Sequence, residues 1–134
     1  MNINQATDYG FRAILYLSEQ AKGEVVEAQA IAQSQSIPMR FLLKIMPSLI
    51  KAGIVRSQRG VGGGYILAKE PGEITLLDVI EAVEGPFYLN RCLIDESFCS
   101  KNGPPNCKVH QALEDIQQRL IQDFQSYTFA ELRD

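Results

Sequence analysis

The chain has no tryptophan, one histidine and three cysteines among its 134 residues, and it lacks any long apolar run. No stretch reaches the roughly 18 consecutive apolar residues of a membrane-spanning helix, so we expect no membrane partner. The first residues show no basic stretch followed by an apolar core, which leaves no visible secretory signal. An odd cysteine count without such a signal argues against a disulfide framework and favours a cytoplasmic protein.

The scarcity of histidine also limits catalysis. The sole histidine, His110, lies beside the cysteines in the sequence, and no convincing nucleophile–base set is visible elsewhere. We therefore do not expect an enzyme. Hydrophobic residues make up 46% of the chain and charged residues 22%, a balance typical of chains that fold. At this length the chain suits one domain, or one small domain with an arm.

Acidic residues are missing from a long central window. The net charge is −3, yet no Asp or Glu occurs from Ala28 to Lys69, and six cations do. Residues 1–72 carry 8 Lys+Arg and 5 Asp+Glu, whereas residues 73–134 carry 5 Lys+Arg and 11 Asp+Glu. A stretch of one sign inside an acidic protein suggests a local polyanion site, although a solvated basic face without a ligand fits the charges equally well.

The hydrophobic spacing of residues 1–72 predicts three helices followed by a glycine-rich hairpin. The expected helices span 4–22, 27–34 and 39–52, and the expected strands span 54–58 and 65–67. On the third helix, an apolar face lies opposite a stripe made of Arg40, Lys44, Ser48 and Lys51. These are the parts of a winged helix-turn-helix, in which the third helix enters the DNA major groove. The hairpin would place Arg59 on the DNA backbone or in the minor groove.

All three cysteines and the histidine fall within residues 92–110, in the pattern C-x6-C-x7-C-x2-H. Thiolates and an imidazole close together suit a soft metal ion or an iron–sulfur cluster. A zinc site is less favoured, because structural zinc sites usually separate paired cysteines by only about two to four residues. Three unrelated thiols and a surface histidine remain the plain alternative.

The chain after Pro71-Gly72 predicts a second region. We expect a helix over 76–84, capped by Thr75, then the cysteine loop, then a long helix over 109–124. A lone amphipathic helix must bury its apolar stripe somewhere, and a second copy of the chain is a natural place. We therefore divide the chain into a DNA-binding region, 1–72, and a region 73–134 that holds the loop and a dimerisation helix.

Several stretches resemble the Rrf2 superfamily of bacterial winged-helix regulators, and the match covers nearly the whole chain. The stretches that carry it are TDYGFRA at 7–13, the Ile37-Pro38 turn with Phe41-Leu42, AGIVRSQRG at 52–60, GGYILAK at 63–69 and ITLLDVIEAVEG at 74–85. The superfamily includes iron–sulfur members such as IscR, NsrR and RirA, and cysteine-free members such as CymR that respond through partner proteins. The resemblance implies a mainly helical homodimer with one cluster per subunit and the long final helix at the interface.

By position, the resemblance assigns Cys92, Cys99 and Cys107 to the cluster. It offers two candidates for the fourth ligand: His110, as in IscR-like members, and Asp8 of the other subunit, as in NsrR-like members. We favour His110 because it is close in sequence and is the softer ligand. The cysteine spacing is looser than in IscR or NsrR, so two-iron and four-iron clusters both stay open.

The resemblance also places Arg40 and Leu43 at base-contacting positions and Arg59 at the wing. IscR-like members carry a glutamate where this chain has Leu43, and leucine cannot accept a hydrogen bond from cytosine. The operator preference of those members therefore does not transfer. The full set that we expect to meet double-stranded DNA is Arg40, Leu43, Lys44, Lys51, Arg56, Ser57, Arg59 and Gly60.

Together these features predict a dimeric transcriptional regulator, favoured as a repressor, whose operator binding is controlled by an iron–sulfur cluster that senses cluster or iron status, redox state or nitric oxide. A cluster-free regulator using zinc, a thiol switch or a protein partner is the main alternative. An electron-transfer protein would explain the cysteines but not the acid-free helix and wing.

Overall fold

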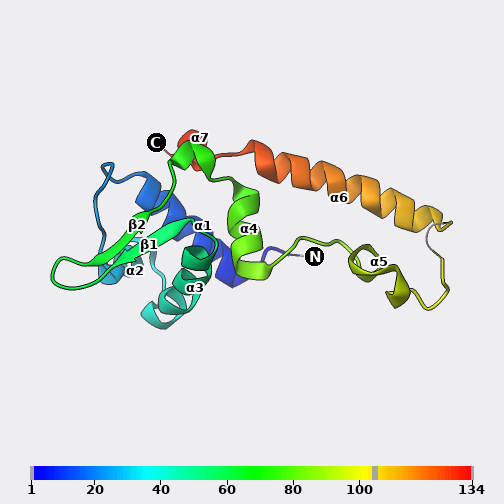
Figure 1. The fold of residues 1–134 in the computed structure, drawn as a ribbon, viewed down its shortest axis with the longest axis horizontal. Coiled ribbons are helices and arrows are strands. Elements are labelled where there is room, and N and C mark those ends of the chain that lie inside the picture. Colours follow the sequence, from blue (N-terminus) through cyan, green and yellow to red (C-terminus); the bar gives the residue numbers. More distant parts are fainter. Residues whose placement is uncertain (1, 104–105, 134) are drawn as a thin grey trace.

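The computed structural model describes residues 2–103 and 106–133. It is mainly helical, with one antiparallel pair of strands, as expected (Figure 1). The α-helices are α1 (Gln5–Ser18), α2 (Ala28–Gln35), α3 (Met39–Lys51), α4 (Leu76–Glu84), α5 (Arg91–Ile94), α6 (Lys108–Ser126) and α7 (Phe129–Leu132). The strands are β1 (Val55–Gln58) and β2 (Gly64–Leu67), and the 3-10 turns are η1 (Pro71–Glu73) and η2 (Glu96–Phe98).

Helices α1 to α4 enclose one hydrophobic core. The predicted apolar face of α3 supplies its centre, because Leu42, Met46 and Leu49 are fully buried. Helix α4 packs on α1 at Gly10, where an added Cβ would lie 3.1 Å from the Val79 side chain. The hydrophobic core therefore extends past residue 72. The division of the chain at that residue into a DNA-binding region and a dimerisation region remains a prediction.

Local sequence explains where α1 and α4 begin and end. Asn4 caps α1 by accepting the Thr7 amide at 2.8 Å, and Thr75 forms a reciprocal capping box with Asp78 at the start of α4. Helix α1 stops at Ser18, four residues before the predicted end, and the Ser18 hydroxyl donates back to the Leu15 carbonyl at 2.6 Å. Gly23, the glycine after the predicted end of the helix, therefore lies in the turn that follows α1 and does not end the helix.

The wing contains one more extended segment than the sequence predicted. β1 and β2 pair from Val55 opposite Leu67 to Gln58 opposite Gly64. On the other edge of β2, Val26 and Tyr65 exchange two backbone hydrogen bonds of 2.9 and 2.8 Å. This contact needs a glycine at position 64, where a Cβ would lie 2.2 Å from the Val26 carbonyl oxygen. The bridge fixes the base of the wing to the loop between α1 and α2.

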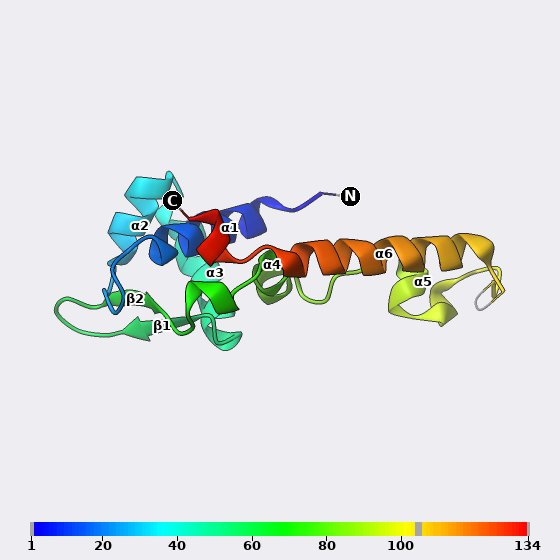
Figure 2. The ribbon, with the colours of Figure 1, turned by 90° about the horizontal axis from the view of Figure 1, so that it is seen from above.

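The chain after α4 leaves the core, forms an extended arm and then returns to pack against the core. Residues 85–126, here called the arm, leave the core after α4 and end in the long helix α6, which stretches away from the rest of the molecule (Figures 1 and 2). The chain then comes back, so that Phe129 of α7 is 1% exposed and its amide donates to the Ile74 carbonyl at 3.0 Å. Residues 2–84 and 127–133, here called the body, thus hold both described chain ends.

The cysteine segment is more ordered than the predicted loop. Helix α5 and turn η2 occupy its first half, and Asn90 and Asp95 cap them by accepting amides of the following residues. These elements are too short for hydrophobic periodicity to reveal them. Of the residues that follow, 104 and 105 lie outside the described chain.

Candidate functional site

The outer face of α3 carries the predicted reading residues. Arg40, Leu43, Lys44 and Lys51 are all exposed, opposite the buried face, and Leu43 is 49% exposed. Their position follows from the helical period, since residues three, four and seven apart share one face. Pro47 lies inside α3, which nevertheless continues to Lys51.

Arg40 does not extend freely into solvent. Its guanidinium lies 4.8 Å from the centre of the Phe41 ring, and the Phe41 ring lies 5.9 Å from the ring of Tyr9 on α1. Tyr9 is 7% exposed, so the stack is anchored in the core. Sequence spacing does not predict this contact, because adjacent residues on a helix do not face each other by default.

The wing presents a second set of exposed residues. Arg56, Ser57, Arg59 and Gly60 are all exposed, and Val61 at the tip is as accessible as in an extended peptide. Gly60 has a φ of +93°, and its carbonyl accepts the Gly63 amide at 3.0 Å, which closes the tip. The cation of Arg59 therefore stands at the start of a tight, small-residue turn that a DNA groove can admit.

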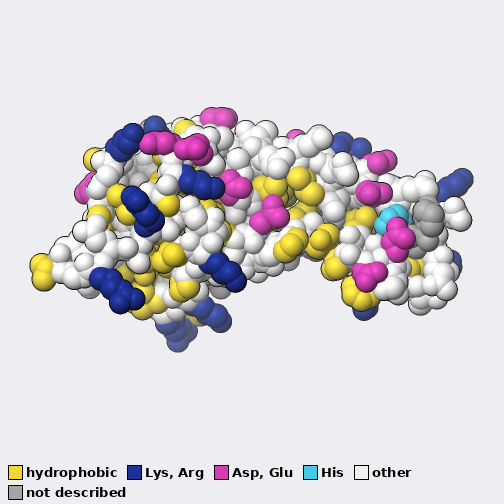
Figure 3. All heavy atoms as spheres, in the orientation of Figure 1, with side chains coloured by type: hydrophobic (Ala, Val, Ile, Leu, Met, Phe, Trp, Pro, Cys, Tyr) yellow, Lys and Arg dark blue, Asp and Glu magenta, His cyan; other side chains and the backbone are white. Residues whose placement is uncertain are grey.

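Among residues 2–103 and 106–133, the cations of these two elements have no carboxylate partners. The ion pairs in the described chain join Arg12 to Asp8 and Lys22 to Glu70, at 2.7 and 2.9 Å, and neither pair lies on α3 or the wing. In Figure 3, dark blue side chains gather along the lower edge of the body, beneath α3 and the wing, where no magenta is visible. Unpaired exposed cations on one face are the electrostatic footprint of a polyanion-binding surface.

The tip of the arm gathers the other group of predicted residues. Cys92 lies in α5, Cys99 follows η2, Cys107 caps α6, and His110 lies in the first turn of α6. The His110 Nδ1 lies 3.1 Å from the Cys92 Sγ, while the His110 amide donates to the Cys107 Sγ at 3.5 Å. All three cysteines are free and half-buried, and His110 is 7% exposed.

Cys99 has the most distinctive environment of the three thiols. Backbone amide donors, first that of Gly103 and then that of Lys101, lower the pKa of the Cys99 thiol below its ordinary value. The Gly103 amide donates to the Cys99 Sγ at 3.4 Å. A sulfur that accepts amide hydrogen bonds is suited to the thiolate form, which is the form that binds metals.

The three cysteines and His110 fit a group that is bound by thiolates, although in the described chain they do not surround the position of a single metal ion. Gly103 leaves an open space, or cradle, beside two sulfurs, since a Cβ there would lie 3.6 Å from both the Cys99 Sγ and the Cys107 Sγ. Across residues 2–103 and 106–133, no three His, Cys, Asp or Glu groups lie close enough together to hold one metal ion. A cluster of several irons accepts sulfurs that are further apart than the ligands of one zinc ion.

Asp8, the alternative fourth ligand, lies elsewhere. It occupies the first turn of α1 in the body, where its carboxylate binds Arg12, which also donates to the Gln35 carbonyl at 3.3 Å. Within one chain, α1 and the tip of the arm lie apart (Figure 1). Asp8 could meet the cysteines only if a second chain brought them to it.

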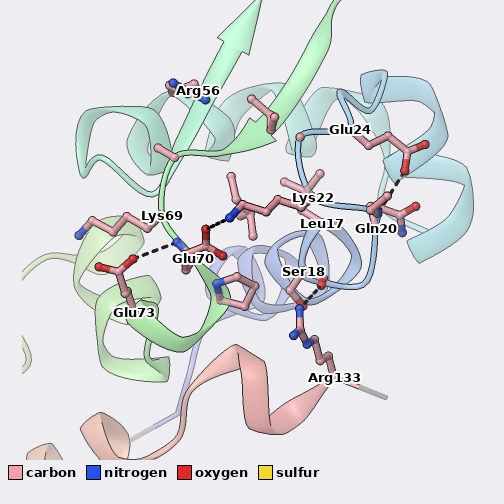
Figure 4. A pocket seen from close by; sticks show the side chains of 16 residues that line it. Leu17, Ser18, Gln20, Lys22, Glu24, Arg56, Lys69, Glu70, Glu73 and Arg133 are labelled. Atoms are coloured by element: carbon pink, nitrogen blue, oxygen red, sulfur yellow. Dashed lines mark hydrogen bonds and ion pairs between the residues drawn. The ribbon is translucent and has the colours of Figure 1, made fainter.

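A separate polar cavity of about 380 Å³ lies between the end of α1, the base of the wing and η1 (Figure 4). Lys22 and Glu70, which form an ion pair with exposed side chains, line it, and Arg133 donates to the Ser18 carbonyl at 3.1 Å. Arg56, a predicted DNA contact, is on its rim. The cavity is remote from the cysteines and shares no residue with them.

Comparisons with known proteins agree with this architecture. The Rrf2 family model, described as an iron-dependent transcriptional regulator, matches residues 3–134. The chain belongs to the Rrf2 family. A relative from Aquifex aeolicus, whose name assigns it to the HTH-type transcriptional regulators, is 33% identical over 132 residues, covering 98% of this chain and 91% of that protein.

Two solved structures show how closely the Rrf2 fold is kept. CymR, the global cysteine regulator of B. subtilis, is 27% identical with a TM-score of 0.78, covering 98% of this chain and 95% of its own. T. potens IscR is 26% identical with a TM-score of 0.75, covering 98% and 85%. The predicted winged-helix fold is confirmed, and the chain is a DNA-binding transcriptional regulator of a family that typically acts as dimers. Within the described residues, no helix is long and apolar enough to span a membrane.

Proposed function

We propose that this regulator binds its operator as a homodimer under the control of an iron–sulfur cluster held at the tip of the arm. The observation that carries the proposal is the meeting of the donors at that tip, with the His110 Nδ1 3.1 Å from the Cys92 Sγ. The Rrf2 family membership and the likeness to IscR support the same kind of cofactor. The signal would be cluster or iron status, redox state or nitric oxide.

DNA recognition is divided between α3 and the wing. Arg40, Leu43, Lys44 and Lys51 would enter the major groove, where arginine binds guanine in a bidentate manner and leucine packs against a thymine methyl group. Arg56, Ser57, Arg59 and Gly60 would contact the backbone or a narrow minor groove. The exposure of all eight residues and the absence of carboxylate partners in the described chain support this division.

The cluster would be held by the thiolates of Cys92, Cys99 and Cys107 together with His110. When bound, such a group supplies a centre that changes oxidation state and can be lost on attack by oxidants or nitric oxide. The chain's own residues position it: the Gly103 amide orients the Cys99 sulfur, and burial fixes the His110 ring beside Cys92. Asp8 of a second subunit is the alternative to His110, and its use would break the Asp8–Arg12 ion pair.

Dimerisation through α6 would connect the two sites. Val109 and Ile116 of α6 are 66% and 40% exposed, and Leu120 and Phe124 are only half-buried. A second copy covering this stripe would set the spacing of the two α3 helices. Loss of the cluster would free the three cysteines and relax the segment before α6. That order–disorder change would alter operator affinity.

The first test is an absorption spectrum with iron and acid-labile sulfide analysis on protein purified without oxygen. We expect brown protein, and the iron count per chain will separate a two-iron from a four-iron cluster. Cys99→Ala should then lose the cluster and change operator affinity relative to the loaded wild type, with Ser100→Ala as the neighbouring control. Equal operator affinity and equal site preference of the loaded wild type and Cys99→Ala would contradict control of DNA binding by the cluster.

A cluster-free regulator using zinc, a thiol switch or a protein partner is the second candidate function. The lowered pKa of Cys99 and the structural likeness to CymR, a cysteine regulator, favour it. Colourless protein that also resists anaerobic reconstitution would select this candidate and leave the DNA-binding half of the proposal unchanged.

A further inference from the structure

The backbone φ angle at Gly103 is not one that only glycine adopts readily. Six glycines of the described chain have positive φ, a region that side chains disfavour, but Gly103 is not among them. Its carbonyl accepts the Asn106 amide at 2.9 Å. The φ angle of Gly103 therefore does not explain why a glycine stands there, and its surroundings offer another reason.

Those surroundings are two cysteines. A Cβ at position 103 would lie 3.0 Å from the Cys107 Cβ and 3.6 Å from the sulfurs of both Cys107 and Cys99. Even an alanine would require Cys107 to shift by a few tenths of an ångström, and a larger side chain would crowd both sulfurs. On the same side, the Gly103 amide donates to the Cys99 Sγ at 3.4 Å.

We propose that Gly103 is a positioning residue that holds the Cys99 and Cys107 thiolates ready to bind a thiophilic metal. Its missing side chain leaves space beside both sulfurs, and its amide fixes one of them. The proposal deepens the function proposed above, since the same pair would be half of the cluster ligand set. The other half is the contact of Cys92 with His110, which does not involve Gly103.

Both features of Gly103 act before any metal arrives. Each thiol must give up its proton when a metal binds, and an amide donor already in place stabilises the sulfur that carries the resulting charge. Cys107 is also the N-cap of α6, where its sulfur accepts the His110 amide. A shift of Cys107 would therefore misplace a ligand and loosen the first turn of the helix together.

The test uses Gly103→Ala and a matched control, Gly72→Ala. Gly72 also lacks positive φ, and a Cβ there would meet only the Ala130 Cβ at an ordinary 3.8 Å. The full-length reduced protein is titrated with Cd²⁺, and binding is followed by the thiolate-to-metal absorption in the ultraviolet. We expect Gly103→Ala to bind Cd²⁺ about tenfold more weakly or worse, as for other groups that orient metal ligands. Gly72→Ala should bind like wild type.

A second pair of variants isolates the two sulfurs. In a Cys92→Ser background, only Cys99 and Cys107 remain as thiols, and the effect of Gly103→Ala should persist in full. Equal Cd²⁺ affinity of Gly103→Ala and Gly72→Ala, or a wild type that binds no Cd²⁺ at all, would overturn the proposal. The iron and sulfide analysis tests the cluster separately: a protein that binds Cd²⁺ through this pair but never takes up a cluster keeps the role of Gly103 and loses the cluster function.

Discussion

The body and the arm differ in how much of each is buried. In the body, α3 alone contributes four buried side chains to a core shared with α1 and α4. In the described part of the arm, His110 is the one buried residue. A segment with so few buried apolar contacts opens easily, whereas the body has its own cooperative core. We conclude that the body is held by its own core, whereas the arm has few buried contacts and, in the function proposed above, would gain them from a second chain and a metal.

The largest expected effect is a difference in the free energy of unfolding between substitutions of two adjacent leucines on α3. Leu42 is fully buried and Leu43 is 49% exposed. Leu42→Ala should lower the free energy of unfolding by about 2–5 kcal/mol, because it leaves a cavity in the core. Leu43→Ala should change it by no more than about 0.5 kcal/mol while altering operator preference. Urea unfolding followed by circular dichroism measures the difference, and similar losses for the two would contradict the assigned helix face.

The arm should respond through association rather than folding. Ile116 is 40% exposed in the single chain, so burying the rest of it in an interface contributes about 0.6–1.2 kcal/mol per copy, and about twice that for the two copies of a dimer. Ile116→Ser should therefore raise the dimer dissociation constant about tenfold. Analytical ultracentrifugation measures this constant. The neighbouring exposed Gln118→Ser is the control and should leave it unchanged; an unchanged constant for Ile116→Ser would remove α6 from the interface.

The sequence predicted long helices better than short elements and long-range contacts, for a physical reason. Buried faces of long helices produce a periodic pattern, so α4 was predicted with its observed ends and the buried face of α3 was correct. Helix α5 has four residues and cannot show a period. The Val26–Tyr65 bridge and the return of Phe129 to the core are long-range contacts that local patterns do not encode.

The candidate sites divide in another way. Residue types alone predicted the candidate site residues, such as the three cysteines. The contacts around them came only from the structure, such as the position of Gly103 beside Cys99 and Cys107. The stack of Arg40 on Phe41 likewise depends on a rotamer that spacing does not indicate. The assignments to DNA and to a cluster stay predictions.

A smaller effect is expected for the charge of the wing. If Arg59 meets a phosphate, Arg59→Ala should reduce the slope of log affinity against log salt concentration by about 0.9, the contribution of one released counterion. Lys101→Ala, an exposed cation of the arm, is the control and should leave the slope unchanged. Operator titrations at several salt concentrations measure both. A loss confined to A·T-rich operators would place Arg59 in a narrow minor groove instead.

The smallest effect concerns the aromatic support of Arg40. Phe41→Leu keeps an apolar contact with Tyr9 but removes the ring on which the guanidinium rests, and cation–π contacts at exposed sites contribute about 0.5–1 kcal/mol. Operator affinity should therefore fall about two- to fivefold with no change in salt slope, since the charge of Arg40 is kept. In an Arg40→Ala background, Phe41→Leu should have no further effect. A loss of the same size in both backgrounds would mean that Phe41 acts on the packing of α3 against α1 rather than on the reading side chain.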